Sequence, residues 1–416
     1  MFYQPNLTTV VSNLFGDTHM KVNELNPIIV SLYNAKRTGM FWGAPGIGKS
    51  SAFRAAAEAI KNSLGLPGPV LERHQIKPFL ASMTEKYGAD KAREMIRQCF
   101  GLFDLRLSQE DPVDIGGLPR ENKDTHTMEK LVPSWFAHSM RHDLPDHGIL
   151  LLEELPSAPV SVQTAAYQIT LDGVIGDFRL KKGWTTFAAG NRLTDGGQFF
   201  KMPNALANRL CHIDVESNLD SWVEWAINNG VDHSLIAFLR FRPDLLNTYE
   251  DHVKNKRKGM AFATERQWHA VDDFLKGNAS ADDALTYAVV AGLVGEGPAA
   301  EYVGFRKVWH NMPSIDGILI DPASAVLPED AATQYAVMTA LAGRACYDNA
   351  KQCFDYVDRM TATGRSDMSM LFVRDMVQRQ AVAAEAARKA GKPFQRAEQS
   401  PSFSIWASKN AALFGQ

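Results

Sequence analysis

The octapeptide GAPGIGKS, residues 43–50, constrains this chain more than any other feature. It satisfies the pattern GxxxxGK[S/T] and lies between a short apolar stretch and the alanine-rich helical pattern SSAFRAAAEAI. Glycines in such a loop let backbone N–H groups surround phosphate oxygens, while the lysine neutralises the β- and γ-phosphates and the serine hydroxyl ligates magnesium. We therefore predict a P-loop that binds ATP and Mg²⁺ through Gly43, Ala44, Pro45, Gly46, Ile47, Gly48, Lys49, Ser50 and Ser51.

The chain around this loop alternates short apolar runs with helical patterns, which is typical of a parallel sheet built from strand–helix units. This pattern predicts an α/β fold with strands at residues 39–42, 102–107, 147–152 and 184–189. The apolar stretch after residue 209 is a candidate fifth strand. The amphipathic stretch 77–100 predicts a helical insertion between the first helix and the second strand.

Two acidic residues follow the third predicted strand, in the sequence ILLLEE. A P-loop ATPase needs a strand that ends in acids beside the magnesium ion. We expect Glu153 to hold the magnesium shell and Glu154 to orient and activate the attacking water. The first acid is usually Asp, so contact of Glu153 with the metal through a water molecule is an alternative. The alternative to a catalytic role is that both acids are simply solvated at the end of the strand.

A polar residue, Asn191, follows the fourth predicted strand in WTTFAAGNR. Ligands of parallel α/β sheets bind at the carboxyl edge of the strands. A neutral amide there can hydrogen-bond both the γ-phosphate and the lytic water, although an Asn after a Gly is also a common turn former. We interpret Asn191 as a catalytic residue.

Beyond residue 215 the pattern becomes helical, and strand signals nearly vanish. We predict an N-terminal segment (1–24), an α/β nucleotide-binding domain (25–216), a helical lid domain (217–312) and a helical C-terminal region (313–416). The stretch DGILIDPASAVLP, residues 316–328, is interpreted as a linker.

Composition excludes some classes of function. The formal net charge is -3 and the pI is about 6.4, so no global attraction to nucleic acid or to an anionic membrane is expected. The four cysteines form no CxxC pair, which favours reduced thiols. The first residues carry no basic residue ahead of the apolar ones, and no uncharged apolar run of about 18 residues occurs. We expect a cytoplasmic protein without a signal peptide or a membrane span.

Taken in order, these motifs resemble those of the AAA+ superfamily, and within it the MoxR-like branch. Beyond the P-loop the resemblance rests on four segments: DLRLSQEDPVDIGGLPR (104–120), LLLEELPSAPVSVQTAAYQITLDGVIG (150–176), AAGNRLTD (188–195) and MPNALANRL (202–210). It implies two hairpins, at 116–133 and 174–183, of the kind that faces the ring pore or a partner in that family. It also implies an ATP-dependent ring, a hexamer, that remodels or matures a protein client. The segment AVVAGLVGEGPAAEYVGFRKVW resembles MoxR-like ATPases that are paired with von Willebrand factor A domain proteins.

Two arginines are candidates for completing the active site. Arg209 lies at the position that, in ring-forming ATPases, projects toward the nucleotide of the neighbouring subunit. Arg266, in FATERQW at the start of a lid helix, is expected to reach the phosphates within its own subunit. A solvated arginine or a structural ion pair is the alternative for each. Arg192 competes with Arg209, but its place beside Asn191 predicts that it stays close to its own sheet.

Two other functions stay open. Related AAA+ branches translocate DNA, so a nucleic-acid motor of restriction type is one alternative; KNKRKG, residues 254–259, is the only dense cationic run that favours it. The other is a regulatory nucleotide switch that hydrolyses ATP slowly, with Glu153 as the cause.

Overall fold

The computed structural model describes residues 19–192, 199–254, 261–278 and 280–411, and the chain divides into two compact units, Met1–Ser217 and Asn218–Gln416. The finer division into segments 1–24, 25–216, 217–312 and 313–416 stays a prediction.

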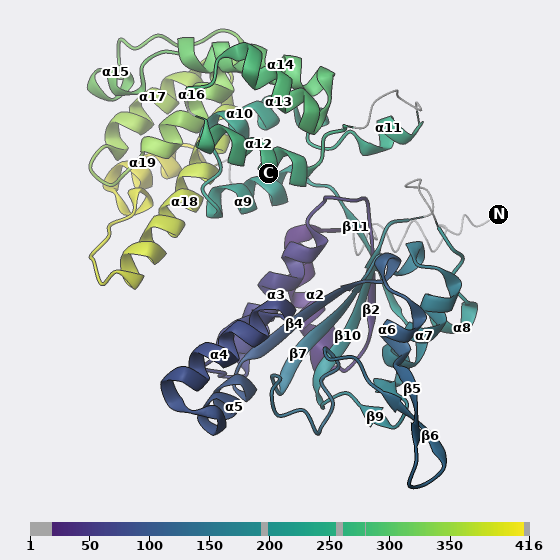
Figure 1. Ribbon diagram of the computed structural model, residues 1–416. Helices are drawn as coiled ribbons and strands as arrows, with labels where there is room; N and C mark the ends of the chain where they lie inside the picture. The colour runs from purple at the N-terminus through teal and green to yellow at the C-terminus, as the bar shows by residue number, and fades with distance from the viewer. Residues whose placement is uncertain (1–18, 193–198, 255–260, 279, 412–416) are drawn as a thin grey trace, which may run out of the picture. The chain divides into compact units, whose positions relative to one another are not determined.

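A seven-stranded sheet forms the centre of the first unit (Figure 1). All six strand pairs are parallel. The strands run in the order β1 (His19–Lys21), β11 (Cys211–Glu216), β2 (Gly39–Trp42), β10 (Gly183–Gly190), β7 (His147–Glu153), β4 (Phe100–Arg106) and β3 (Val70–Glu72). The predicted α/β fold is therefore confirmed, with the four predicted strands and the candidate fifth in place. Strands β1 and β3 were not predicted; each has three residues at an edge of the sheet.

Both faces of this sheet are buried, which explains why its strands read as continuous apolar runs. Along β7, Ile149 and Leu151 belong to one core and Leu150 and Leu152 to the other, as the two-residue period of a strand requires. Helices α2 (Leu25–Asn34) and α3 (Lys49–Ser63) cover the first face, while α7 (Val160–Asp172) covers the second (Figure 1).

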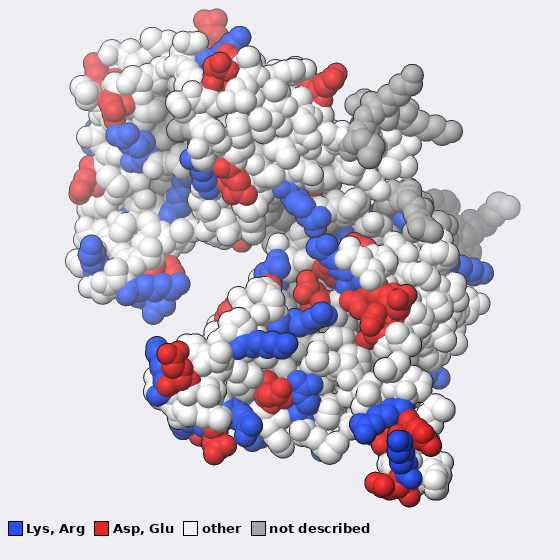
Figure 2. Space-filling view, viewed as in Figure 1, with Lys and Arg blue, Asp and Glu red and all other residues white. Residues whose placement is uncertain are grey.

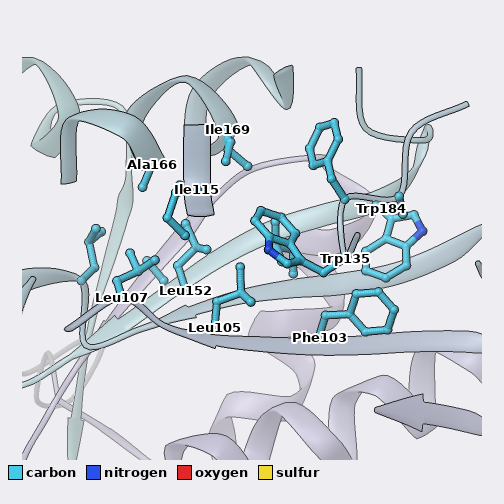
Figure 3. Close-up of a cluster of buried hydrophobic side chains, with 14 of the residues drawn as sticks. Phe103, Leu105, Leu107, Ile115, Trp135, Leu152, Ala166, Ile169 and Trp184 are labelled. Carbon is cyan, nitrogen blue, oxygen red and sulfur yellow. The ribbon is translucent and has the colours of Figure 1, made fainter. Parts of the chain in front are cut away.

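Trp184 lies at one end of the second core, part of which is drawn in Figure 3. Its ring lies against Phe103, with centroids 4.8 Å apart. A Cβ atom at Gly101 or Gly148 would approach within 2.7 Å of this indole. Glycine at these positions of the adjacent strands β4 and β7 therefore leaves room for the tryptophan ring.

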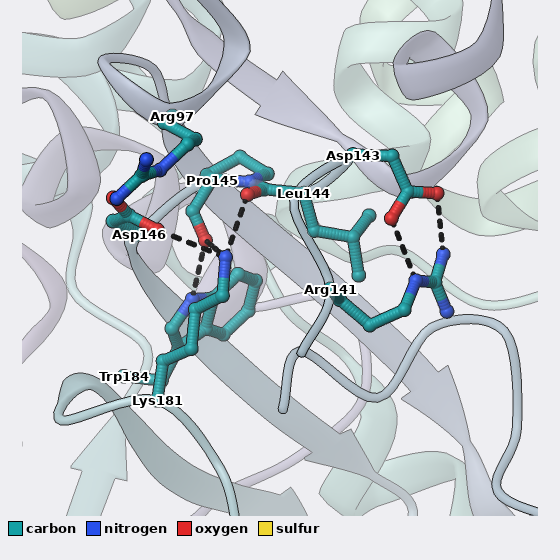
Figure 4. Close-up of polar contacts among 8 residues, drawn as sticks. All are labelled: Arg97, Arg141, Asp143, Leu144, Pro145, Asp146, Lys181 and Trp184. Atoms are coloured by element: carbon teal, nitrogen blue, oxygen red, sulfur yellow. Dashed lines mark hydrogen bonds and ion pairs between the residues drawn. The ribbon is translucent and has the colours of Figure 1, made fainter. Parts of the chain in front are cut away.

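A polar cluster closes the amino end of β7 and β10 (Figure 4). The Nζ atom of Lys181 donates to the carbonyl oxygens of Leu144 and Pro145 and to Asp146, at 2.9, 3.4 and 2.9 Å, and the Trp184 Nε1 atom donates to the Pro145 carbonyl at 3.0 Å. Burial lowers the pKa of Lys181 despite the neighbouring carboxylate. Burial alone would raise the pKa of Asp146, but Lys181 and then Arg97 outweigh it and hold that pKa below its usual value.

The predicted insertion forms two helices, α4 (Ile76–Tyr87) and α5 (Ala89–Arg97). Both predicted hairpins are also present. The first, β5 (Leu118–Asn122) with β6 (Thr127–Leu131), follows the short helix α6 (Pro112–Gly116), and the second pairs β8 (Val174–Ile175) with β9 (Phe178–Arg179). They touch, because the Lys130 side chain lies over Gly176. Nearly every residue of the first hairpin is exposed, and its tip carries both positive and negative side chains (Figure 2).

The second unit is helical, and none of its described residues forms a strand. Its buried residues fall into two clusters. A buried ion pair, Arg240 with Asp375, joins α10 (His233–Phe241) to α18 (Ser366–Lys389). None of the helices in the described part of the chain is long and apolar enough to cross a membrane. The helices of the unit are α9 (Leu219–Asn228), α10 (His233–Phe241), α11 (Tyr249–Lys254), α12 (Glu265–Gly277), α13 (Asp283–Val294), α14 (Glu296–Asn311), α15 (Ile315–Ile320), α16 (Ala331–Arg344), α17 (Ala350–Ala362), α18 (Ser366–Lys389) and α19 (Pro401–Lys409).

The prediction of a linker at 316–328 is wrong. Its first part is α15, whose Ile318 is buried in a hydrophobic cluster. The rest is fixed to α17, because Arg359 donates to the Ala325 carbonyl at 2.8 Å and the Tyr356 hydroxyl donates to the Val326 carbonyl at 2.9 Å. These contacts join residues distant in sequence, which a local pattern does not reveal.

Candidate nucleotide-binding site

The predicted P-loop connects the end of β2 to the start of α3. Two of its glycines have backbone angles that favour glycine, with φ of 81° at Gly46 and 99° at Gly48. At Gly43 the reason is space: a Cβ atom there would lie 2.6 Å from both Ile47 Cδ1 and the Val215 carbonyl oxygen. The Gly43 N–H also donates to the Gly190 carbonyl oxygen at 3.1 Å. The loop is therefore held between β10 and β11.

The cation of the motif lies over this loop. Lys49 Nζ donates to the carbonyl oxygens of Gly43 and Ala44, at 2.6 and 2.9 Å. Lys49 is also the first residue of α3, whose first N–H groups have no partners within the helix. A loop of this form with a lysine and a helix N-terminus fits the phosphates of a nucleotide.

The P-loop meets the acidic strand at Ser50. Its hydroxyl donates to Glu153 Oε1 at 2.5 Å, and the other oxygen of Glu153 lies 3.8 Å from Arg106 Nε. Only 15% of the Glu153 side chain is exposed. A hydroxyl and a carboxylate are hard oxygen donors of the kind that Mg²⁺ prefers, so this pair fits a magnesium ion. The longer side chain of Glu153 does not prevent contact with Ser50.

The second acid, Glu154, is exposed and lies at the end of β7. Its backbone is left-handed, with φ of 58°, and it precedes the short 3₁₀ helix Leu155–Ser157. The Ser108 hydroxyl donates a hydrogen bond to its carboxylate. Such a backbone conformation is uncommon for a residue other than glycine and is often found at functional sites.

Asn191 directly follows β10 and is half-buried. The register aligns the strand ends, because Gly190 pairs with Trp42 and Ala188 pairs with Leu152. The carboxyl ends of β2, β7 and β10 therefore place the P-loop, both acids and Asn191 at one edge of the sheet. Residues 193–195 of the AAGNRLTD segment lie outside the described residues.

The three arginines differ in their surroundings. Arg192 donates to Asp214 at 2.9 Å and to the Val215 carbonyl oxygen at 3.1 Å, so it is held at its own sheet. Arg209 is exposed between α8 (Asn204–Ala207) and β11, and no ion pair of its side chain occurs within the described ranges. Arg266, the second residue of α12, is exposed in the other compact unit.

Sequence reasoning assigned no role to two residues that contact the acids, Arg106 and Ser108. Arg106 is the last residue of β4 and pairs with Glu153 in the register, and Ser108 lies two residues beyond that strand. Their position at the end of an apolar strand is the same signal that identified the acids. The chain order alone does not indicate that this strand neighbours β7.

No family model matches the sequence, and no curated protein matches it. Solved structures with some likeness include a proposed ATPase from Cytophaga hutchinsonii, with 11% identity, 85% of this chain and 80% of that chain covered, and a TM-score of 0.30. NtrX from Brucella abortus has 16% identity, covers 89% of this chain and 72% of its own, and has a TM-score of 0.35. AMPPCP-bound DnaA from Aquifex aeolicus has 11% identity, with 100% and 96% covered and a TM-score of 0.21. These likenesses are too low to support a function, so the fold class rests on the sheet itself.

Proposed function

We propose that this chain binds ATP with Mg²⁺ and hydrolyses it to ADP and phosphate. The contact between Ser50 and Glu153 carries this proposal, because it joins the P-loop to the acidic strand at the place where a nucleotide-bound magnesium ion needs oxygen ligands. The P-loop in direct contact with the acidic strand is a more specific sign of an ATPase than either motif alone.

The residues of the candidate site would have separate roles in ATP hydrolysis. Lys49 would exchange its carbonyl partners for the β- and γ-phosphates, and Ser50 and Glu153 would hold Mg²⁺, which supplies charge neutralisation at the transferring phosphoryl group. Glu154 would orient the attacking water and take its proton with the carboxylate oxygen to which Ser108 does not donate. Asn191 would hydrogen-bond the γ-phosphate and the water without adding charge.

We further propose that the chain acts as an AAA+ protein of the MoxR-like branch, in a hexameric ring that remodels a protein client, with a von Willebrand factor A domain protein as a candidate partner. Two features support this. The β5–β6 hairpin has almost no buried residue, which suits a contact outside its own unit. Arg209 is exposed at the end of the turn that precedes β11, where it could serve the nucleotide of a neighbouring subunit.

Mixing of variants tests the ring and the trans arginine together. Arg209→Ala and Lys49→Ala proteins are each expected to be inactive, because a guanidinium at the transferring phosphoryl group is worth roughly 10³ to 10⁵ in rate. A mixed ring contains interfaces at which an intact P-loop faces an intact Arg209, so turnover should reappear on mixing. Normal turnover by Arg209→Ala alone would exclude the trans role, and absence of wild-type turnover under all conditions would exclude the ATPase.

A slow nucleotide switch is the second candidate, and the bond from Ser108 to Glu154 favours it, since this bond takes up one of the two carboxylate oxygens of the proposed general base. Single-turnover hydrolysis by wild type and Ser108→Ala separates the two: a large acceleration in the variant supports the switch. A nucleic-acid motor is less favoured, because positive and negative side chains are interspersed on the face that Figure 2 shows. Residues 255–259 of its cationic run lie outside the described residues. Stimulation of ATP turnover by DNA would favour the nucleic-acid motor.

A further inference from the structure

A single imidazole joins the P-loop strand to the turn that carries Arg209. Trp42, the last residue of β2, donates from Nε1 to His212 Nδ1 at 2.8 Å. The other ring nitrogen of His212, Nε2, lies 2.8 Å from the Ala207 carbonyl oxygen. The two rings are nearly parallel, with an interplanar angle of 14°.

The chemistry of the two partners fixes the role of each nitrogen. Indole N–H is only a donor and a carbonyl oxygen is only an acceptor. His212 must therefore accept at Nδ1 and donate from Nε2, as the neutral tautomer with its proton on Nε2. The contact depends on both strands, because His212 pairs with Met40 and Asp214 pairs with Trp42. This register puts the side chains of Trp42 and His212 on the same face of the sheet.

The ends of this connection lie at two parts of the candidate site. Trp42 directly precedes Gly43, the first residue of the P-loop. Ala207 ends α8, and the N–H of Arg209, two residues later, donates to the Leu206 carbonyl oxygen at 3.0 Å. Leu206 and Leu210 are buried on either side of this turn, so a shift of Ala207 would move Arg209 with the turn.

We propose that His212 is a positioning residue that couples the P-loop to the turn bearing Arg209, so that nucleotide in a subunit's own loop alters the placement of its arginine. The inference rests on the proposed ATPase function and goes beyond it, because it links two sites within one subunit. A purely structural role, in which His212 only satisfies the last carbonyl of a short helix, predicts an effect on stability alone.

Three variants test the coupling: Trp42→Phe, His212→Phe and the double variant. The first two remove the same hydrogen bond from opposite sides while keeping a ring. A net hydrogen bond corresponds to roughly a 2- to 10-fold change in an equilibrium or rate. We expect kcat to fall by roughly 2- to 10-fold in each single variant, the KM for ATP to change by less than about 2-fold, and the double variant to be no slower than the slower single one.

The spectroscopic readout is the fluorine NMR signal of Trp42 in protein labelled with 5-fluorotryptophan. This signal is assigned by its absence in Trp42→Phe. In the otherwise unchanged protein this signal should shift when Mg²⁺ with a non-hydrolysable ATP analogue is added, and His212→Phe should move it already without nucleotide. His269→Phe is the matched control, because that histidine also lies against a tryptophan, Trp225, with ring centroids 4.9 Å apart, in the helical unit. It should leave kcat and the Trp42 signal unchanged.

The outcomes separate the two proposals. If wild-type protein turns over ATP and Arg209→Ala slows it, but His212→Phe and Trp42→Phe do not change kcat, the coupling is wrong and the ATPase stands. If the losses in kcat were additive in the double variant, His212 would have a structural role only. The same would follow if the variants lost equal amounts of melting temperature while the Trp42 signal did not shift. No turnover by the wild type would remove the ATPase, and the coupling with it.

Discussion

Replacing Gly190 by alanine should disturb hydrolysis far more than ATP binding. A Cβ atom at this position would lie 2.3 Å from Pro156 Cδ, 2.7 Å from Pro156 Cγ and 3.2 Å from Met40 Cε. Carbon atoms in contact are normally about 3.5–4.0 Å apart, so the proline ring must retreat by roughly 1 Å. The ring is tied to the backbone two residues after Glu154, which has a left-handed conformation of its own. The displacement is therefore passed to the proposed general base.

The size of the effect follows from this geometry. Overpacking of a filled interior costs about 1–3 kcal/mol, and in a unit of this size each kcal/mol lowers the melting temperature by roughly 2–4 °C. A misplacement of about 1 Å at a catalytic group can cost about 10²-fold in rate. We expect kcat to fall by about 10²-fold. ATP affinity should change little, because the P-loop residue Gly43 contacts the backbone carbonyl oxygen of Gly190, which the added methyl group does not replace.

The assay compares kcat, ATP affinity and melting temperature with those of Gly116→Ala. That glycine lies in the same unit, and its added Cβ atom would meet only Ala165 Cβ at 3.6 Å and Lys130 Nζ at 3.9 Å. If Gly190→Ala matched this control in both kcat and melting temperature, the proposed transmission through Pro156 would be refuted. Loss of ATP affinity equal to the loss of kcat would also contradict it.

Four further substitutions and one deletion test the site and the fold. Lys49→Ala should abolish tight ATP binding while the protein stays folded; unchanged affinity in an equilibrium titration would be incompatible with the P-loop assignment. Glu154→Gln should retain Mg-ATP but lose roughly 10²- to 10⁴-fold in turnover, whereas Glu153→Gln should weaken the dependence on magnesium; exchanged phenotypes would reverse the two roles. Replacing residues 118–131 by a short glycine–serine link should leave basal ATPase activity intact and remove action on a client, and an unfolded product would contradict this. Lys181→Met should lower the free energy of unfolding by about 1–3 kcal/mol, measured by chemical denaturation, because the Leu144 carbonyl oxygen loses its donor, while the Pro145 carbonyl and Asp146 each lose one of two donors; an unchanged midpoint would show that water replaces it.

Local sequence patterns predicted the parts of this fold whose determinants are local. The strands β4, β7 and β10 are long and buried on both faces, so each is a visible apolar run. The three-residue strands β1 and β3 are too short to show a period. The helix α15 was missed because Ile318 is buried by α16 and α17, which follow it in the chain.

The same distinction holds for the candidate site. Glycines, a lysine and acids at strand ends could be recognised because each motif is contiguous. The contact of Glu154 with Ser108 could not be recognised, because it depends on β4 and β7 being neighbours in the sheet. The contact of Gly43 with Gly190 likewise depends on β2 and β10 being neighbours. Strand order is a tertiary property, and no local pattern encodes it.

Arg192 and Arg209 differ in their surroundings, and this difference favours Arg209 for the proposed role at another subunit. Arg192 directs Nε to Asp214 and Nη2 to the Val215 carbonyl oxygen, and Val215 in turn limits the space beside Gly43. Arg192 thus stabilises the junction of β10 and β11 behind the P-loop, and moving it to a phosphate outside its own subunit would leave Asp214 and that carbonyl without their donor. Arg209 is exposed on a turn held by buried leucines, so the proposed role at a neighbour's nucleotide would break no contact described within its own unit.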